Sequence, residues 1–116
     1  MKALHTICHQ TNGRFNNVRN VNPATGEYLS GWWQLPAEEA PELVGGWLYL
    51  HETSGTKSGL IGRILGVSFD EQRKAYDIQF RVVREVAPVA WRGAKAGQSP
   101  QHYFRIVDAS LPHETA

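Results

Sequence analysis

Alternation of apolar and polar residues predicts short β-strands along most of the chain. The clearest case is residues 75–83, "AYDIQFRVV", where Tyr76, Ile78, Phe80 and Val82 share one face of the expected strand. The alternation loses its phase at Val82 and Val83, which indicates a strand end or a bulge there.

Similar patterns predict further strands, separated by turns and one short helical region. The expected strands cover residues 3–9, 31–35, 47–51, 60–69 and 102–108. Two glycines within 60–69 indicate a bulge, a bend or close approach of another chain segment. Pro36, Pro41 and Gly45 favour one or two helical turns between residues 36 and 46. The Asn- and Gly-rich segment 10–31 is expected to be a long loop with room for a short strand, and 70–74 a polar hairpin connection.

Five or six short strands with few helical residues predict a mainly β (α+β) fold, a small and strongly bent β-barrel with one or two short helices. The length of 116 residues and the absence of repeats predict a single domain over 1–116. Hydrophobic residues make up 41% of the chain, which is typical of a globular protein. No apolar run approaches the roughly 20 residues of a membrane span, and no signal-peptide core follows the first residues. A single cysteine, Cys8, fits a reducing compartment, so we expect a cytoplasmic protein.

The distribution of charge is more informative than the formal net charge of +1. Residues 36–52 hold glutamates and no Lys or Arg, whereas residues 1–26 and 86–107 hold cations and no carboxylate. If the two ends of the chain meet in the fold, they form one basic face; otherwise these runs are ordinary solvated surface. The cations concerned are Lys2, Arg14, Arg19, Arg92, Lys95 and Arg105.

The glycine-rich turn "SGTKSG" at residues 54–59 has the composition of a phosphate-binding loop but not its spacing. In the nucleoside-triphosphate loop, lysine directly follows glycine and a helix comes next. Here Thr56 separates Gly55 from Lys57, and a strand pattern follows. Nucleotide hydrolysis by such a loop is therefore excluded, and Lys57 stays a candidate contact at the tip of a turn between two strands.

Histidine spacing does not predict a metal site, and we expect neither a metal nor another cofactor. On a strand, His5 and His9 would lie about 13 Å apart, and the remaining histidines show no ligand spacing. His51 and Glu52, followed by hydroxyl residues, supply the residue types of a polar acid–base pocket, although adjacent strand residues face opposite ways. No catalytic residue is assigned.

Tryptophan placement suggests an aromatic binding surface. Trp32 and Trp33 are adjacent on an expected strand, so they cannot both enter one core, and one of them should line a groove, pocket or interface. Trp91 is followed by Arg92 and Lys95 in an expected basic loop. An exposed tryptophan beside cations is what a base-stacking site requires, although a single Trp can equally cap a barrel end.

Residues 31–91 resemble the PUA-like superfamily, including its ASCH and EVE branches. The matching pattern is "AEEAPELVGGWLYLH", then "ETSGTKSG", then "LIGRILGVSF", followed by "YDIQFRVVREVAPVAW"; the Gly-x-Lys-x-x-Glu-x-Arg signature of ASCH domains is absent. The resemblance implies a bent β-barrel that binds RNA, or modified bases in DNA, in a cleft beside the short helix. Some ASCH members are instead small amidohydrolases that act on a modified nucleoside.

The leading hypothesis is a nucleic-acid-binding domain that stacks a modified or extruded base of RNA or DNA on Trp32 or Trp33, with Trp91 as the next candidate. The expected phosphate and backbone contacts around it come from Arg14, Arg19, Lys57, Ser58, Arg92 and Lys95. One alternative is a small hydrolase of a modified nucleoside that uses His51, Glu52 or Lys57. Another is a protein-interaction or inhibitory module anchored by exposed tryptophans.

Overall fold

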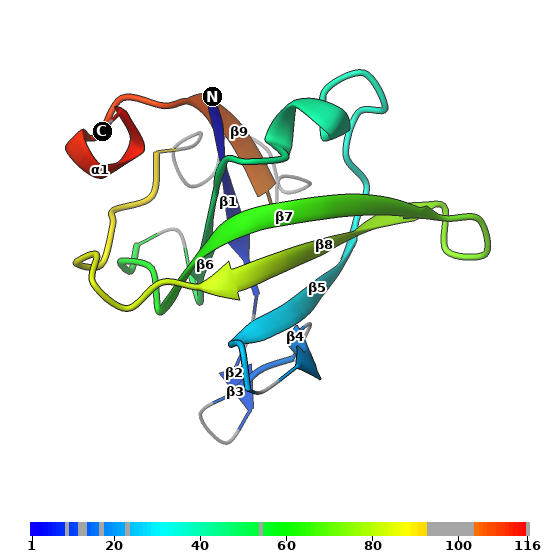
Figure 1. Cartoon of the computed structure of the whole chain (residues 1–116), viewed down its shortest axis with the longest axis horizontal. Coiled ribbons are helices and arrows are strands. Elements are labelled where there is room, and N and C mark those ends of the chain that lie inside the picture. The colour runs from blue at the N-terminus through cyan, green and yellow to red at the C-terminus, as the bar shows by residue number, and fades with distance from the viewer. Residues whose placement is uncertain are drawn as a thin grey trace.

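The described residues of the chain form one mixed sheet of seven strands and a separate two-stranded ribbon (Figure 1). A computed structural model describes residues 1–8, 10–11, 14–16, 18–22, 24–53, 55–92 and 104–115, without the side chain of Arg14. In order of pairing, the sheet strands are β4 (Val18–Asn22), β5 (Glu27–Trp33), β8 (Ala75–Val82), β7 (Leu60–Asp70), β6 (Trp47–His51), β1 (Lys2–Ile7) and β9 (Phe104–Asp108). The ribbon pairs β2 (Gln10–Thr11) with β3 (Arg14–Phe15).

β1 and β6 form the one parallel pair among the described strands, and they lie deepest in the molecule. Their register places Leu4 opposite Leu48 and His5 opposite Tyr49. Every residue of β6 is buried, which is typical of a strand covered on both faces. This burial explains why "WLYLH" is continuously apolar or aromatic until His51.

Two hydrophobic clusters lie on opposite faces of this pair. We call the face of Leu4 and Leu48 the inner face; its cluster includes Trp33, Leu43 and Phe80. We call the opposite face the outer face. Its buried cluster consists of Ala3, Trp47, Tyr49, Ile61 and Val89.

The described residues also form two short helices. The 3-10 helix η1 (Ala40–Leu43) buries Ala40 and Leu43 against the inner cluster, and Gly45 follows it with a φ of 83°, a conformation that favours glycine. The helix α1 (Pro112–Thr115) lies beside the N-terminal end of β1 (Figure 1). No described helix has the length and apolar character needed to cross a bilayer.

Most of the predicted elements are confirmed. Strands occupy 47–51, 60–70 and 75–82, and β8 ends at Val82, where the alternation loses its phase. The register of β7 against β8 shifts between Ile64 and Gly66, which is the expected bulge. The side chain of Phe80 packs so closely over Gly62 that a Cβ there would overlap it.

The expectation of a long loop over residues 10–31 is wrong. These residues supply β2, β3, β4 and most of β5. β4 pairs only on one side, and its residues after Val18 are exposed, so an edge strand tolerates a polar sequence with no alternation. The actual turn is shorter, at residues 22–27, where Gly26 has a φ of 72°.

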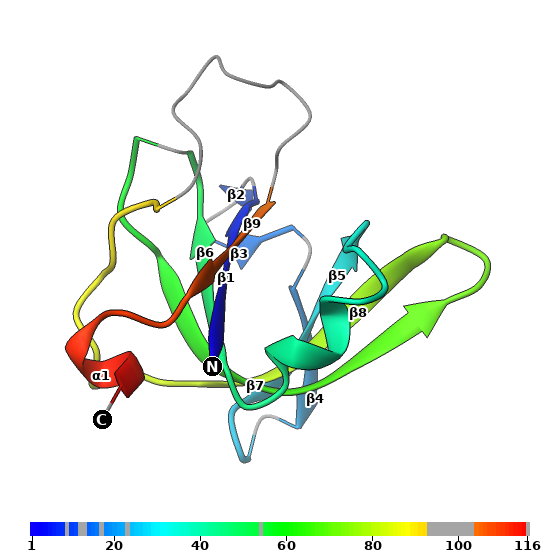
Figure 2. The same ribbon diagram turned by 90° about the horizontal axis from the view of Figure 1, so that it is seen from above.

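The expected count of five or six strands is too low for the same reason. The sheet is mainly antiparallel, and its described edges, β4 and β9, are not paired with each other. Figure 2 shows the β7–β8 hairpin extending away from β1 and β6, which opens the sheet further. The two ends of the chain meet, because β1 pairs with β9, so the condition for a joint basic face is fulfilled. There Lys2 forms an ion pair with Asp108 at 2.6 Å, so part of the expected basic face is neutralised.

Substitution of Gly46 by alanine should destabilise the fold by about 1–3 kcal/mol. A methyl group at this position would overlap the backbone carbonyl oxygen of Lys2, which cannot move without disturbing β1. Gly55→Ala is the matched control, because its nearest neighbour, Oγ1 of Thr53, would lie 3.8 Å away. Urea denaturation measures both variants, and equal stabilities would contradict the close packing at Gly46.

Candidate functional site

Two histidines from neighbouring strands form the centre of a buried polar network on the outer face. The parallel register pairs His5 with Tyr49 and Ile7 with His51, so both imidazole rings project from one face. Nδ1 of His5 lies 2.8 Å from Nε2 of His51, and both residues are 0% exposed. Trp91 packs edge-on against both rings, with centroid distances of 5.7 and 5.3 Å.

The groups around this pair determine which ring nitrogens carry hydrogen. Nδ1 of His51 lies 2.9 Å from the carbonyl oxygen of Thr56, and it must be the donor because a carbonyl only accepts. Nε2 of neutral His51 then accepts, so Nδ1 of His5 donates to it. The remaining nitrogen, Nε2 of His5, accepts a hydrogen bond from Nε of Arg92 at 2.9 Å. The donors therefore point one way, from Arg92 through both histidines to Thr56.

Arg92 also connects the histidines to Glu114 of α1. Its guanidinium donates to both carboxylate oxygens, at 2.9 and 2.5 Å, in the bidentate geometry that suits arginine. The hydroxyl of Tyr49 donates to the same carboxylate at 2.5 Å. The backbone N–H groups of Ser110 and Leu111 donate at 3.0 and 3.1 Å. Glu114 is only 2% exposed, and these five hydrogen bonds compensate for the loss of water around its charge.

Burial and hydrogen bonding fix the charge states of this network. Burial, together with His51 and Arg92, lowers the pKa of His5 to about 3. Burial also lowers the pKa of His51, against the opposing effect of its backbone hydrogen bond. Burial alone would raise the pKa of Glu114, but hydrogen bonds from Arg92, a tyrosine hydroxyl and two backbone N–H groups lower it to about 2. Both histidines are thus neutral and Glu114 is ionised at neutral pH.

The geometry indicates that this network has a structural role. We call it the structural lock; it consists of His5, His51, Tyr49, Arg92 and Glu114, with Trp91 packed against both imidazole rings. Each ring nitrogen of His5 and His51 is engaged in a hydrogen bond, which leaves no lone pair to accept a proton or bind a metal. In the described part of the chain, no three potential metal ligands come together. The hydrogen bonds join β1 and β6 to the segment around Arg92 and to α1, so they hold the C-terminal segments against the sheet.

A second group of polar residues lies on the part of the outer face that α1 leaves uncovered. The side chains of β4, β5 and β8 that point to this face are exposed or half-exposed. Along each strand they alternate with side chains that point towards the inner cluster. We call this surface the open sheet face. From the strand register and side-chain contacts, its residues are Arg19, Glu27, Leu29, Trp32, Asp77, Gln79 and Arg81.

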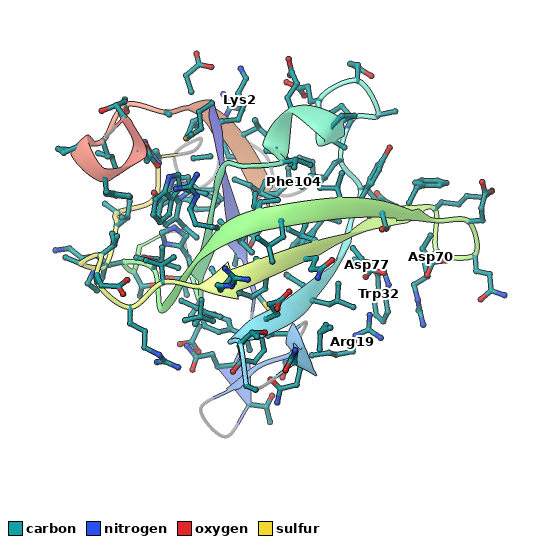
Figure 3. The ribbon with its side chains drawn as sticks, viewed as in Figure 1. Lys2, Arg19, Trp32, Asp70, Asp77 and Phe104 are labelled. Atoms are coloured by element: carbon teal, nitrogen blue, oxygen red, sulfur yellow. The ribbon has the colours of Figure 1, made fainter. Side chains whose placement is uncertain are left out.

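Trp32 is the aromatic residue of the open sheet face, and two arginines lie over its ring. Cζ of Arg73, from the β7–β8 turn, is 3.6 Å from the ring centroid, and Cζ of Arg19 is 5.1 Å from it. Arg19 pairs with Asp77 at 3.5 Å and Arg73 with Asp70 at 3.7 Å, and their side chains are 55% and 52% exposed. Figure 3 shows Arg19, Trp32, Asp70 and Asp77 gathered beside the β7–β8 hairpin.

Two polar atoms at this position are shielded from solvent without a hydrogen bond to the described residues. They are Nε1 of Trp32 and Oδ1 of Asp77, the second of which has only the ion pair with Arg19. Shielded polar groups are nearly always hydrogen-bonded in folded proteins. The indole N–H of Trp32 and this oxygen of Asp77 are thus two buried polar atoms whose hydrogen-bonding capacity the described residues leave unused.

The adjacent tryptophans point to opposite faces, as predicted. Trp33 is 5% exposed, packs in the inner cluster, and donates from Nε1 to Oγ of Ser30 at 3.0 Å. The prediction that Trp33 stacks on a base is therefore wrong, because core side chains already cover its ring. Trp32 is half-buried and is the candidate of the two.

The other predicted contacts do not gather around Trp32. Lys57 is exposed in the β6–β7 connection, and the neighbouring Ser58 is buried, its hydroxyl accepting a hydrogen bond from a backbone N–H at 2.9 Å. Trp91 and Arg92 belong to the structural lock. β8 and β7 separate the strand of Trp32 from β6 in the sheet. The single cleft expected between these elements is therefore not formed by the described residues.

The remaining predicted residues are less informative. Glu52 is exposed and His51 is buried, so they face opposite ways and form no joint pocket. Lys95 and Ser54 lie outside the described residues, as does the side chain of Arg14.

Sequence reasoning missed His5, Tyr49 and Glu114 as partners, and also Arg73. Their roles depend on the parallel pairing of β1 with β6 and on the return of α1, which no hydrophobic pattern specifies. The available signal was a histidine within each of two otherwise apolar strands, since buried polar groups require partners.

Comparison of the chain with protein-family models, curated proteins and solved structures finds no match. The geometry of the two sites is thus the only basis for a functional proposal.

Acidification should destabilise the fold from about pH 6.5 downwards. His5 resists protonation down to a pKa of about 3, whereas an unfolded histidine titrates near 6.5, so the unfolded state binds more protons in this window. The stabilising contribution of neutral His5 is complete above pH 6.5 and is lost as the pH falls. Glu114, with a pKa of about 2 in place of 4.5, adds a further loss below pH 4.5. Chemical denaturation across this pH range measures the effect.

The control for this prediction is His5→Gln, which removes the titrating group. This variant should be less stable at neutral pH but should show a shallower slope of unfolding free energy between pH 6.5 and 4.5. A wild-type stability that stays constant from neutral pH to 4.5 would contradict the neutral, buried state of the histidines.

Replacement of Arg92 by methionine should cost about 3–5 kcal/mol, because it leaves the carboxylate of Glu114 buried without its cation. Arg84→Met is the matched control: Arg84 is exposed in the same segment and has no ion pair to any described residue. Its substitution should change stability by less than about 0.5 kcal/mol. Equal losses in the two variants, measured by urea denaturation, would show that the ion pair is dispensable.

Proposed function

We propose that the protein binds single-stranded nucleic acid on the open sheet face, with a base stacked at Trp32. The observation that supports this function is the half-buried indole of Trp32 on an exposed sheet surface, with Arg73 and Arg19 lying over it at 3.6 and 5.1 Å. Bases stack on aromatic rings and on guanidinium planes alike. A base therefore inserts between Trp32 and one of these arginines, or stacks on the outer side of the guanidinium group.

Charge on the open sheet face suits contact with a phosphate backbone. Arg19, Arg73 and Arg81 have side chains that are 55%, 52% and 55% exposed, and each is held by one carboxylate at 3.5 to 3.9 Å. Such loose surface pairs contribute little stability, so a phosphate can replace the carboxylate. The carboxylates nevertheless reduce the local positive charge, and we expect moderate affinity with a moderate dependence on salt.

Recognition of a single strand follows from the shape of this surface. A duplex hides its base faces, whereas an unpaired base can lie flat on a ring that projects from a sheet. The half-buried side chains of Gln79 and Asp77 add hydrogen-bonding groups that can contact base edges. The proposal has three further parts. The protein recognises a modified or extruded base, it is located in the cytoplasm, and its architecture is that of a PUA-like barrel. The base would then be bound on the sheet face rather than beside η1.

The hydrolase alternative receives less support. It used His51, Glu52 or Lys57. Both nitrogens of His51 are occupied in the structural lock, and Glu52 and Lys57 are exposed side chains outside any joint pocket with His51. The rival that uses Trp32 as an anchor for a protein partner stays open, since Trp and Arg are also the typical residues of binding hot spots.

Trp32→Ala should weaken binding of a labelled oligo(U) or oligo(dT) of about 12 nucleotides by tenfold or more, because a stacked base contributes about 1–3 kcal/mol. Phe69→Ala is the matched control: Phe69 is 47% exposed on the same hairpin, but its register with Tyr76 and Trp33 places it on the inner face. Fluorescence anisotropy at two salt concentrations measures both variants.

Three results would count against the proposal. Wild-type protein that binds no single-stranded RNA or DNA would favour a protein partner at Trp32. Equal losses for Trp32→Ala and Phe69→Ala would indicate non-specific contact with the hairpin. Binding that does not weaken with salt would exclude the arginine–phosphate contacts.

A further inference from the structure

A cavity of about 390 Å³ lies beside the edge strand β9, away from the open sheet face. Its walls are Phe104, Arg105 and Ile106 of β9 and, opposite them, Pro36 and Glu39 of the turn that leads into η1. Figure 3 shows Phe104 on the side of β9 that faces η1. The volume is within the range of natural ligand sites, about 300–1,000 Å³.

The identity of the lining residues places this cavity along the edge of the strand. Successive side chains of a strand point to opposite faces, so a cavity on one face would be lined by alternate residues. Three consecutive residues, 104 to 106, line this one. β1 occupies one edge of β9, and no described strand occupies the other. Within the described part of the chain, the cavity is therefore a groove along the edge of β9 that no strand pairs with.

The groove combines three recognition elements. The edge of β9 that no described strand occupies presents backbone N–H and C=O groups that a further strand can pair with. Phe104 and Ile106 supply an apolar floor, since both pack against the inner cluster. Glu39 and Arg105 supply opposite charges on the two walls, and neither has an ion pair with a described residue.

We infer that this groove binds an extended segment of a partner protein, which adds to β9 as an eighth strand of the sheet. A regular row of backbone donors and acceptors matches only another extended chain. The apolar floor takes one apolar side chain of that segment, and the two walls favour a basic residue near Glu39 and an acidic residue near Arg105. This site is separate from the nucleic-acid contact at Trp32 and does not depend on it.

Amide hydrogen exchange of the full chain alone gives the first test. Alternate residues of β9 donate towards β1 and towards the groove, so the expected result is slow exchange at every second amide and fast exchange between them. Slow exchange at all β9 amides in the free protein would show that the edge is already occupied, and it would overturn the inference.

The second test uses a phage-displayed library of random heptapeptides selected against the full chain. Enriched sequences should carry an apolar residue flanked by a basic and an acidic residue. A synthetic peptide of that sequence should slow exchange at the fast β9 amides. Glu39→Lys should weaken its binding about tenfold, in line with loss of a charge-assisted contact, and a peptide with the basic residue changed to glutamate should recover it.

Glu38→Lys is the matched control, because Glu38 is exposed next to Glu39 and does not line the groove. Its peptide affinity should match that of the wild type. Failure to enrich any peptide, or equal losses in the Glu38 and Glu39 variants, would overturn the inference. Trp32→Ala should leave peptide binding unchanged, so this result and the oligonucleotide result are distinguishable.

Discussion

The parallel pairing of β1 with β6 buries two histidines side by side, and the segments around them supply hydrogen-bond partners for both imidazole rings. Once His5 and His51 are removed from water, each ring nitrogen requires a partner. Thr56 accepts at one end of the chain of hydrogen bonds, and Arg92 donates at the other. Arg92 in turn needs a buried anion, which Glu114 of α1 provides. The C-terminal segments are thus held in place by the polar groups that the central strands bury.

This lock divides the outer face of the sheet into two parts. Over β1 and β6 the outer face is covered by α1 and by the segment that contains Trp91, and its polar groups are saturated. Over β4, β5 and β8 it is open, and its arginines are held only by loose pairs with carboxylates. A ligand can replace loose partners but not saturated ones. The physical contrast between the two parts therefore directs the functional proposal to Trp32.

Sequence patterns predicted the fold best where the two faces of a strand differ in polarity, because one face is buried and the other is exposed. The alternation around Ile78 and Phe80 and the opposite orientation of Trp32 and Trp33 follow from strand geometry alone. The edge strand β4 escaped prediction because a strand paired on one side and exposed elsewhere carries no hydrophobic period. The motif at Trp91 and Arg92 has the composition of a nucleic-acid loop, but its arginine is paired with a carboxylate 22 residues further along the chain. Only the tertiary structure reveals that pairing.

The hydrogen bonds of the structural lock require particular positions for the imidazole hydrogens of His5 and His51, and NMR can measure these positions. A long-range correlation between ¹H and ¹⁵N nuclei of the imidazole rings at neutral pH distinguishes the two neutral tautomers from the charged ring. The structure predicts that both His5 and His51 are neutral with hydrogen on Nδ1, because Thr56 accepts and Arg92 donates at the ends of the chain. A hydrogen on Nε2 of either ring, or a charged imidazole at neutral pH, would contradict the one-way network on which this account rests.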